Sequence, residues 1–185
     1  MTTNRCPESA PALAIALTAV VSAGCTTMSR HEAPAAPAAL AVPPGLSLTV
    51  TAAAAGVQIY SCRPSKDDPA KFDWAFVAPE AELRDRAGKV IGKHFAGPSW
   101  ESTDGSKVVG AVAARDPGPD GSAIPWLLLN VTSNTGHGVF EHVRAIQRLH
   151  TVGGKAPTGG CDAGRAEQNA RVPYTADYYF YAEVR

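Results

Sequence analysis

The sequence has few charged residues, and neither sign of charge is in excess. Charged residues make up 18% of the 185 residues, and the 17 Lys and Arg residues equal the 17 Asp and Glu residues in number. A protein that binds a phosphate backbone concentrates Lys and Arg on its surface, so this balance argues against nucleic-acid binding. Hydrophobic residues make up 45% of the chain, which is enough for a packed core.

The sequence also lacks the short motifs that most often identify an active site. It contains no glycine-rich dinucleotide or phosphate loop, no G-x-S-x-G nucleophile motif and no solenoid or propeller repeat. The segment HGVFEH at 137–142 places a glutamate beside a histidine, but in neither order used by zinc hydrolases. Zinc needs three or four converging ligands, and only His94 with two other histidines would supply them. We therefore expect no metal ion and no other cofactor.

The longest apolar run near the start of the chain is too short to cross a bilayer. Residues 11–25 read PALAIALTAVVSAGC, whereas a spanning helix takes about 20 apolar residues. A short apolar run that ends in small residues is typical of a signal peptide. The SAGC ending resembles the lipobox of bacterial lipoproteins, so we predict a signal peptide over 1–24 and a membrane anchor through lipid on Cys25. The alternative is cleavage near Ala23, which would release a soluble exported protein.

The next segment contains little that indicates regular structure. Residues 26–45 are rich in Ala and Pro, and four prolines interrupt any helix there. We predict a lipidated cysteine followed by a spacer over 25–45, or a disordered stub, and then a single domain over 46–185.

Cysteine is scarce, and its positions favour export. Cys6 leaves with the predicted signal peptide and Cys25 is assigned to lipidation, which leaves Cys62 and Cys161. Two remaining cysteines in an exported chain favour a disulfide. The alternative is a pair of buried free thiols.

From residue 46 onward, the apolar residues follow the pattern of β-strands. LSLTVTA at 46–52 and GVQIYSCRP at 56–64 alternate with a period of two. In the second segment, Gln58, Tyr60 and Cys62 are expected on one face of the strand. Further strands are expected at 72–79, 123–133, 143–151 and 177–184.

Turn signals between these strands favour an all-β fold. Arg86-Ala87-Gly88 and Asp104-Gly105 predict hairpins, and the continuous apolar run at 123–133 predicts a strand covered on both faces. Residues 138–145 could equally form a short helix. We predict an antiparallel sandwich or barrel with at most short helices and one disulfide.

Several phrases from residue 56 onward carry a resemblance. In order, they are GVQIYSC, PEAEL, IGKHFAGPSWE, DGSKVVGAV, IPWLLL, IQRLHTVGGKAP and VPYTADYYFY, with Cys161 between the last two. Together they resemble domain-of-unknown-function family 3455, which occurs in exported bacterial and fungal proteins, over residues 46–185. The resemblance implies an exported, β-rich domain with one disulfide and no established activity.

The segment HFAGPSWESTDGS contains the candidate acid and base residues. His94 ends one predicted strand and Glu101 begins the next, so their side chains could converge, and a carboxylate beside an imidazole is a common general base. Asp177 or Asp104 could be a third member. The simpler alternative is that Trp100 caps the core while Glu101 and Asp104 order a hairpin.

Arg148 and the aromatic residues are the candidates for ligand binding. An inward Arg148 needs a partner, because a buried unpaired charge is costly. It could bind a carboxylate or a sugar hydroxyl of a ligand, or it could pair with Glu101 or Asp177 and serve only the fold. Aromatic surfaces bind sugars and apolar ligands, so we select Trp100, Arg148 and Tyr178 as candidate binding residues.

Three functions remain open at this point. The favoured one is a non-catalytic envelope lipoprotein that binds a small molecule, a glycan or a protein partner through an aromatic-lined cleft near His94, Trp100, Glu101, Arg148 and Tyr178. The second is a hydrolase or isomerase that uses His94 and Glu101 as acid and base. The third is a purely structural envelope protein without a pocket.

Overall fold

The structure is a computed structural model that describes residues 32–183. The predicted signal peptide, the predicted lipid attachment site Cys25 and His31 lie outside the described residues. Within 32–183, no helix is both long enough and apolar enough to span a membrane.

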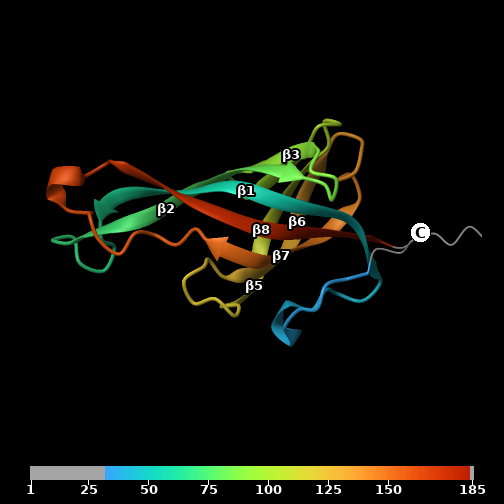
Figure 1. Ribbon diagram of the computed structural model, residues 1–185, viewed down its shortest axis with the longest axis horizontal. Helices are drawn as coiled ribbons and strands as arrows, with labels where there is room; N and C mark the ends of the chain where they lie inside the picture. The colour runs from blue at the N-terminus through green and yellow to red at the C-terminus, as the bar shows by residue number, and fades with distance from the viewer. Residues whose placement is uncertain (1–31, 184–185) are drawn as a thin grey trace, which may run out of the picture.

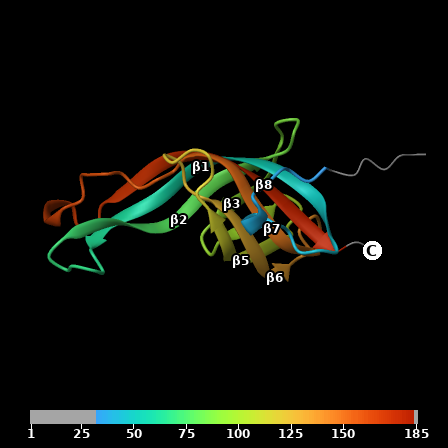
Figure 2. The ribbon, with the colours of Figure 1, turned by 90° about the horizontal axis from the view of Figure 1, so that it is seen from below.

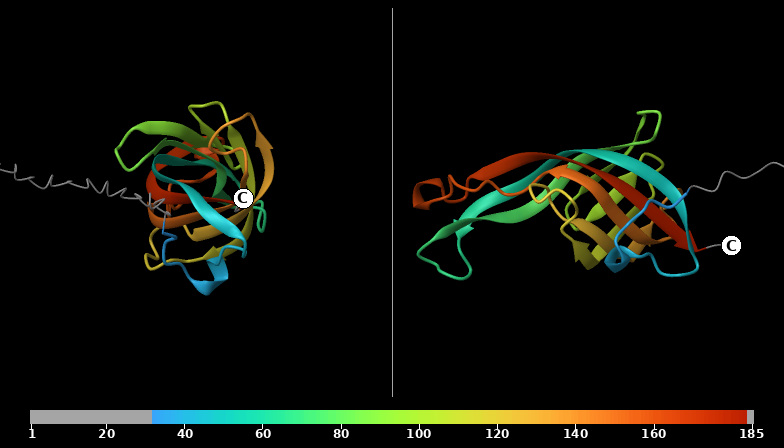
Figure 3. Two further views of the ribbon diagram at one scale, coloured as in Figure 1. Left: turned by 90° about the vertical axis from the view of Figure 1, so that its right-hand side faces the viewer. Right: turned by 60° about the horizontal axis from the view of Figure 1, so that its bottom comes forward.

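Eight antiparallel strands in chain order close into a barrel (Figure 1). Each strand pairs with the next, and β8 pairs with β1 to complete the ring, which is seen along the long axis in Figure 3. The strands are β1 (Leu46–Pro64), β2 (Phe72–Arg84), β3 (Val90–Phe95), β4 (Ser99–Ser102), β5 (Lys107–Asp116), β6 (Trp126–Thr135), β7 (Val143–Gly153) and β8 (Asn169–Glu183). Two short 3-10 turns, η1 (Ala38–Leu40) and η2 (Ala163–Arg165), are the only helical elements among the described residues. The all-β prediction is confirmed, and the architecture is the barrel rather than the sandwich.

The strand β1 is longer than the sequence pattern indicated. The two predicted segments, 46–52 and 56–64, form one continuous strand that pairs with β8 along most of its length and with β2 from Ala53 onward. Gly56 permits this pairing, because a Cβ atom there would collide with the backbone oxygen of Glu80 on β2. As a result β1, β2 and β8 continue past the other strands and form an arm at one end of the barrel (Figure 2).

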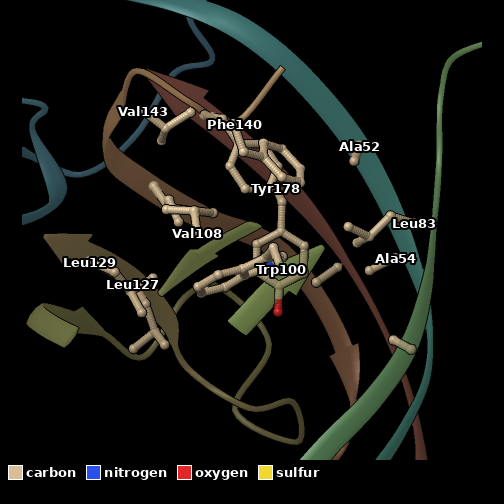
Figure 4. Packing of buried hydrophobic residues seen from close by; sticks show 14 of the residues in the cluster. Ala52, Ala54, Leu83, Trp100, Val108, Leu127, Leu129, Phe140, Val143 and Tyr178 are labelled. Atoms are coloured by element: carbon tan, nitrogen blue, oxygen red, sulfur yellow. The ribbon is translucent and has the colours of Figure 1, made fainter. Parts of the chain in front are cut away.

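The barrel interior is filled by aromatic and aliphatic side chains (Figure 4). Trp100 and Tyr178 are each 1% exposed, and their ring centroids lie 5.4 Å apart at an interplanar angle of 69°. Phe140 and Phe180 pack together deeper in the same cluster, with centroids 4.6 Å apart. Alternation along β8 sends Tyr178 and Phe180 inward and Tyr179 and Tyr181 outward, as a strand requires.

A second apolar cluster covers the outer face of the barrel. Leu40 in η1 is fully buried and packs with Leu128, Leu149 and Tyr181 on the outside of the sheet. Gln147 fixes this contact, because its Nε2 donates to the Leu40 carbonyl at 2.7 Å and its Oε1 accepts from the Tyr181 hydroxyl at 2.6 Å. The apolar packing therefore begins before residue 46, within the segment predicted to be a spacer.

The first half of β6 is apolar because both of its faces are covered. Leu127 and Leu129 face the interior cluster, whereas Leu128 faces the outer cluster beneath Leu40. The prediction of a strand covered on both faces is confirmed for residues 126–129, but Asn130, Thr132 and Ser133 are exposed, and β6 runs over Trp126–Thr135 rather than 123–133.

Both predicted hairpins are present. Arg86-Ala87-Gly88 lies between β2 and β3, and Asp104-Gly105 lies between β4 and β5, where Gly105 has a φ of +88° that favours glycine. The alternative short helix over 138–145 does not form. Instead the chain turns and enters β7 at Val143, while the Asn134 amide donates to the Phe140 and Val143 carbonyls at 2.7 and 3.2 Å.

The predicted disulfide between Cys62 and Cys161 is present. It joins residues 99 positions apart and fastens the segment between β7 and β8 to the arm. Cys62 is fully buried there, and its backbone also exchanges hydrogen bonds with Glu167 and Gln168. A structural disulfide is typical of proteins outside the cytoplasm, so it indicates an extracytoplasmic location.

Candidate functional site

A cavity of about 610 Å³ opens into the barrel interior. Its size falls within the usual range for small-molecule sites, roughly 300 to 1,000 Å³. Most of its wall is aromatic or aliphatic, and every strand contributes to it. The lining residues are Gln58, Tyr60, Phe76, Val77, Pro79, His94, Gly97, Pro98, Trp100, Val112, Arg115, Ile124, Pro125, Leu127, Leu129, Arg148 and Tyr178.

His94 forms one side of the cavity as a neutral imidazole. It is 2% exposed and stacks on Trp100, its cross-strand partner, with ring centroids 4.4 Å apart and planes inclined by 10°. Burial lowers the pKa of His94 to about 3, with a smaller contribution from the Arg148 charge, against the opposing effect of its hydrogen bond to Ser99. Nδ1 lies 2.9 Å from the Ser99 carbonyl, which can only accept, so Nδ1 carries the proton and Nε2 is an acceptor.

Arg148 contributes positive charge to the cavity wall. It lies on β7 opposite Tyr178, and its Nε and Nη2 donate to the Pro125 carbonyl at 3.3 and 2.8 Å. No aspartate or glutamate is among the lining residues. Burial raises the pKa of Tyr178 and the nearby Arg148 charge acts in the opposite direction, so the Tyr178 hydroxyl stays protonated and able to donate.

Four buried polar groups at or beside the cavity make no hydrogen bond of ordinary geometry with the protein. They are the Gln58 and Trp100 side-chain nitrogens and the Tyr174 and Tyr178 hydroxyls. The two tyrosines lie close enough to affect one another's pKa, and burial raises the pKa of Tyr174 strongly. A buried polar group that is left unsatisfied costs about 1 to 3 kcal/mol. These groups present polar atoms to whatever occupies the cavity, water included.

The rim of the cavity exposes apolar surface. Phe76 and Val77 on β2 are 56% and 50% exposed, and Val112 on β5 is 39% exposed. Phe76 also packs edge-on against Tyr60, whose hydroxyl donates to the Gly154 carbonyl at 2.6 Å. Exposed apolar side chains around a cavity are common at entrances to binding sites.

The structure brings four of the predicted site residues together in this cavity. His94, Trp100, Arg148 and Tyr178 all line it.

Two other candidates, Glu101 and Asp177, lie outside this cavity, contrary to the prediction. In the β3–β4 hairpin His94 is paired with Trp100 and Lys93 with Glu101, so alternation places Glu101 on the outer face, where its Oε1 lies 3.3 Å from Lys93 Nζ. Asp177 also points outward and meets His150, with Oδ2 2.9 Å from Nδ1. The predicted acid–base pair is therefore not formed, and neither carboxylate partners Arg148.

Several lining residues were not predicted from the sequence. The alternation along the first strand could have identified two of them, Gln58 and Tyr60. Gln58 and Tyr60 were predicted to share a face of their strand with Cys62, and all three are buried. Gln58 and Tyr60 line the cavity, whereas Cys62 lies farther along the arm. Phe76 had no distinguishing signal, because the neighbouring Trp74 follows the same alternation yet donates from Nε1 to the Gly159 carbonyl.

No cluster suited to a metal ion occurs in the part of the chain that the structure describes, since no three His, Cys, Asp or Glu side chains converge there.

Comparison with known proteins gives one family match. A search of curated proteins and a search of solved structures both returned no match. The family match spans residues 43–182, which covers all but the last residue of the barrel strands. The chain therefore belongs to the family described as "Protein of unknown function (DUF3455)".

Proposed function

We propose that this domain is a non-catalytic binding protein that holds a small molecule inside the barrel. The observation that carries the proposal is the cavity wall, where the buried Trp100 Nε1 has no protein acceptor and the Tyr178 hydroxyl makes no hydrogen bond of good geometry. Fully buried aromatic rings surround these donors, so a ligand there gains apolar burial as well as hydrogen bonds.

The size and lining of the cavity favour a small molecule over a protein partner. A volume of about 610 Å³ suits a drug-sized ligand, and the lining residues Trp100 and Tyr178 are almost fully buried. The stacked His94 and Trp100 rings offer a rigid flat wall.

A neutral fluorescent probe tests this proposal on the full-length chain. N-phenyl-1-naphthylamine becomes bright in apolar sites, and we expect saturable binding of one molecule per chain together with a raised melting temperature. Val112→Trp fills part of the cavity and should weaken binding about tenfold or more. Val152→Trp is the matched control, because Val152 is a 60% exposed strand valine outside the cavity lining.

The proposal is overturned if the probe does not saturate, or if both tryptophan variants affect binding equally. Either result would favour a purely structural role for the domain.

We further propose that the protein is exported and anchored to a membrane through lipid on Cys25. The SAGC sequence that precedes the domain and the Cys62–Cys161 disulfide support export. Mass spectrometry of the mature chain tests this: a diacylated or triacylated N-terminal Cys25 is expected. An N-terminus after Ala23 without lipid would instead make the protein soluble after export.

A further inference from the structure

We propose that the ligand is a small organic anion with a flat apolar body, and that Arg148 binds its acidic group. This inference rests on the proposed binding function and specifies the chemistry of the same cavity.

The charges on the cavity wall are all of one sign. Among the lining residues, Arg115 and Arg148 carry charge and no carboxylate opposes them. The acidic neighbours of Trp100 and Tyr178 are on the outer face, where Glu101 pairs with Lys93 and Asp177 with His150, and Glu80 beside Pro79 pairs with Arg171. His94 is neutral because burial holds its pKa far below 7. The cavity therefore has a net positive potential that a ligand anion would neutralise.

The hydrogen-bonding groups around Arg148 also suit an anion. Its guanidinium has five N–H groups, and the Pro125 carbonyl accepts from two of them, on Nε and Nη2, which leaves N–H groups for a ligand. The Tyr178 hydroxyl lies across the β7–β8 pair from Arg148 and makes no hydrogen bond of ordinary geometry. Trp100 Nε1 is a third group, and like the guanidinium it can only donate. A carboxylate or sulfonate supplies several acceptors to such a set.

The rest of the wall fits the body of the ligand. Trp100 and Tyr178 meet edge to face, and Leu127, Leu129 and Ile124 complete an apolar surface. Flat rings bury apolar area against such walls with little loss of conformational freedom. A highly polar ligand such as a free sugar would bury little apolar area against these side chains.

Two dyes with the same rings test the inference on the full-length chain. N-phenyl-1-naphthylamine is neutral, and 8-anilinonaphthalene-1-sulfonate is the same ring system with one sulfonate. We expect the wild-type chain to bind the sulfonate about tenfold or more tightly than the neutral dye, since a charge-assisted contact is worth at least that ratio.

Variants of Arg148 identify the group responsible. Arg148→Gln should lower the affinity for the sulfonate far more than the affinity for the neutral dye and so abolish the preference, and Arg148→Lys should restore part of the preference. Arg144→Gln is the matched control, because Arg144 lies on the same strand but pairs with Glu183 on the outside. It should change neither dye.

The outcomes separate this inference from the proposed function. If both dyes bind with equal affinity, or if Arg148→Gln retains the preference, the inference is wrong while the binding function stands. If neither dye binds, the binding function fails as well. If Arg148→Gln does not fold, displacement of the neutral dye from the wild-type chain decides: benzoate should displace it and benzyl alcohol should not, and equal displacement overturns the inference.

Discussion

His94 and Trp100 face one another directly across the β3–β4 hairpin, with their rings stacked 4.4 Å apart inside the barrel. The Ser99 carbonyl fixes the imidazole from one edge, and Tyr178 packs against it edge-on with centroids 5.1 Å apart. The hairpin therefore turns two residues that are six apart in sequence into one continuous wall of the cavity.

Because His94 is buried and neutral, the stability of the protein should depend on its titration. Burial is the main cause that lowers its pKa from 6.5 to about 3. Between these values the unfolded chain binds a proton that the folded chain does not, so stability is full above pH 6.5 and falls as the pH decreases. From pH 7.5 to pH 5, the wild type should lose about 2 kcal/mol more than His94→Asn, measured by urea unfolding.

The control for this pH effect is His137→Asn. The His137 side chain is 94% exposed and its contact with Glu141 is on the surface, where ion pairs contribute little, so this variant should differ from the wild type far less than His94→Asn does. Equal pH profiles for the wild type and His94→Asn would show that the imidazole is not held neutral.

Asp104 should stabilise the end of the barrel through contacts that reach beyond its own turn. Its Oδ1 accepts from Ser106 N and Oγ at 2.8 and 2.6 Å, and its Oδ2 accepts from Val139 N at 2.9 Å. Desolvation acts to raise the pKa of Asp104, but these hydrogen bonds outweigh it and lower the pKa to about 2. Asp104→Ala should cost about 1 to 3 kcal/mol in the free energy of unfolding.

Asp120→Ala is a closely matched control for Asp104→Ala. Asp120 Oδ1 accepts from Ser122 N and Oγ at 2.8 and 2.6 Å, but the contact is confined to one exposed turn. Its replacement should change the free energy of unfolding much less than Asp104→Ala does. Equal effects of the two substitutions would mean that the link to Val139 contributes nothing.

Leu40 should be an integral part of the folded domain. It is fully buried against Leu128 and Leu149 on the outer face, so Leu40→Ala should destabilise the protein by about 2 to 5 kcal/mol. Val42→Ala, at a partly buried position of the same segment, should cost about 0.5 to 1.5 kcal/mol. If chemical denaturation finds no loss for Leu40→Ala, residues 36–42 do not pack as described.

The disulfide should account for a large share of stability. In the chain-entropy description, closing a loop with a separation of 99 residues stabilises by about 4 to 5 kcal/mol. Replacing both Cys62 and Cys161 with Ala should lower the free energy of unfolding by roughly that amount. Under reducing conditions, the wild type should approach the stability of the double variant, and a wild type indifferent to reductant would contradict the prediction.

The sequence pattern predicted the strands well because alternation is a local property. It placed Gln58, Tyr60 and Cys62 on one face, predicted both hairpins and indicated that the strand around Leu128 is covered on both sides. The disulfide was predictable because only Cys62 and Cys161 remain in the domain of a chain that is predicted to be exported.

What the pattern could not supply is the register between strands. The acid–base hypothesis assumed that His94 and Glu101 meet, but the hairpin pairs His94 with Trp100, and a shift of one residue reverses the face of a side chain. The burial of Leu40 was not predicted, for a different reason. An Ala- and Pro-rich segment has no periodicity, and its burial depends on Gln147 and Tyr181, which lie more than a hundred residues away.

The most direct test of the central claim uses the indole N–H signals of Trp74, Trp100 and Trp126 in a ¹H–¹⁵N spectrum of the full-length chain. Trp100 Nε1 is buried at the cavity without a protein acceptor, Trp74 Nε1 is bonded to the Gly159 carbonyl on the arm, and Trp126 is outside the cavity lining. Titration with N-phenyl-1-naphthylamine should shift the Trp100 signal, saturating at one equivalent, and leave the other two in place. A Trp100 signal that does not move, or three signals that move together, would contradict a binding site inside the barrel.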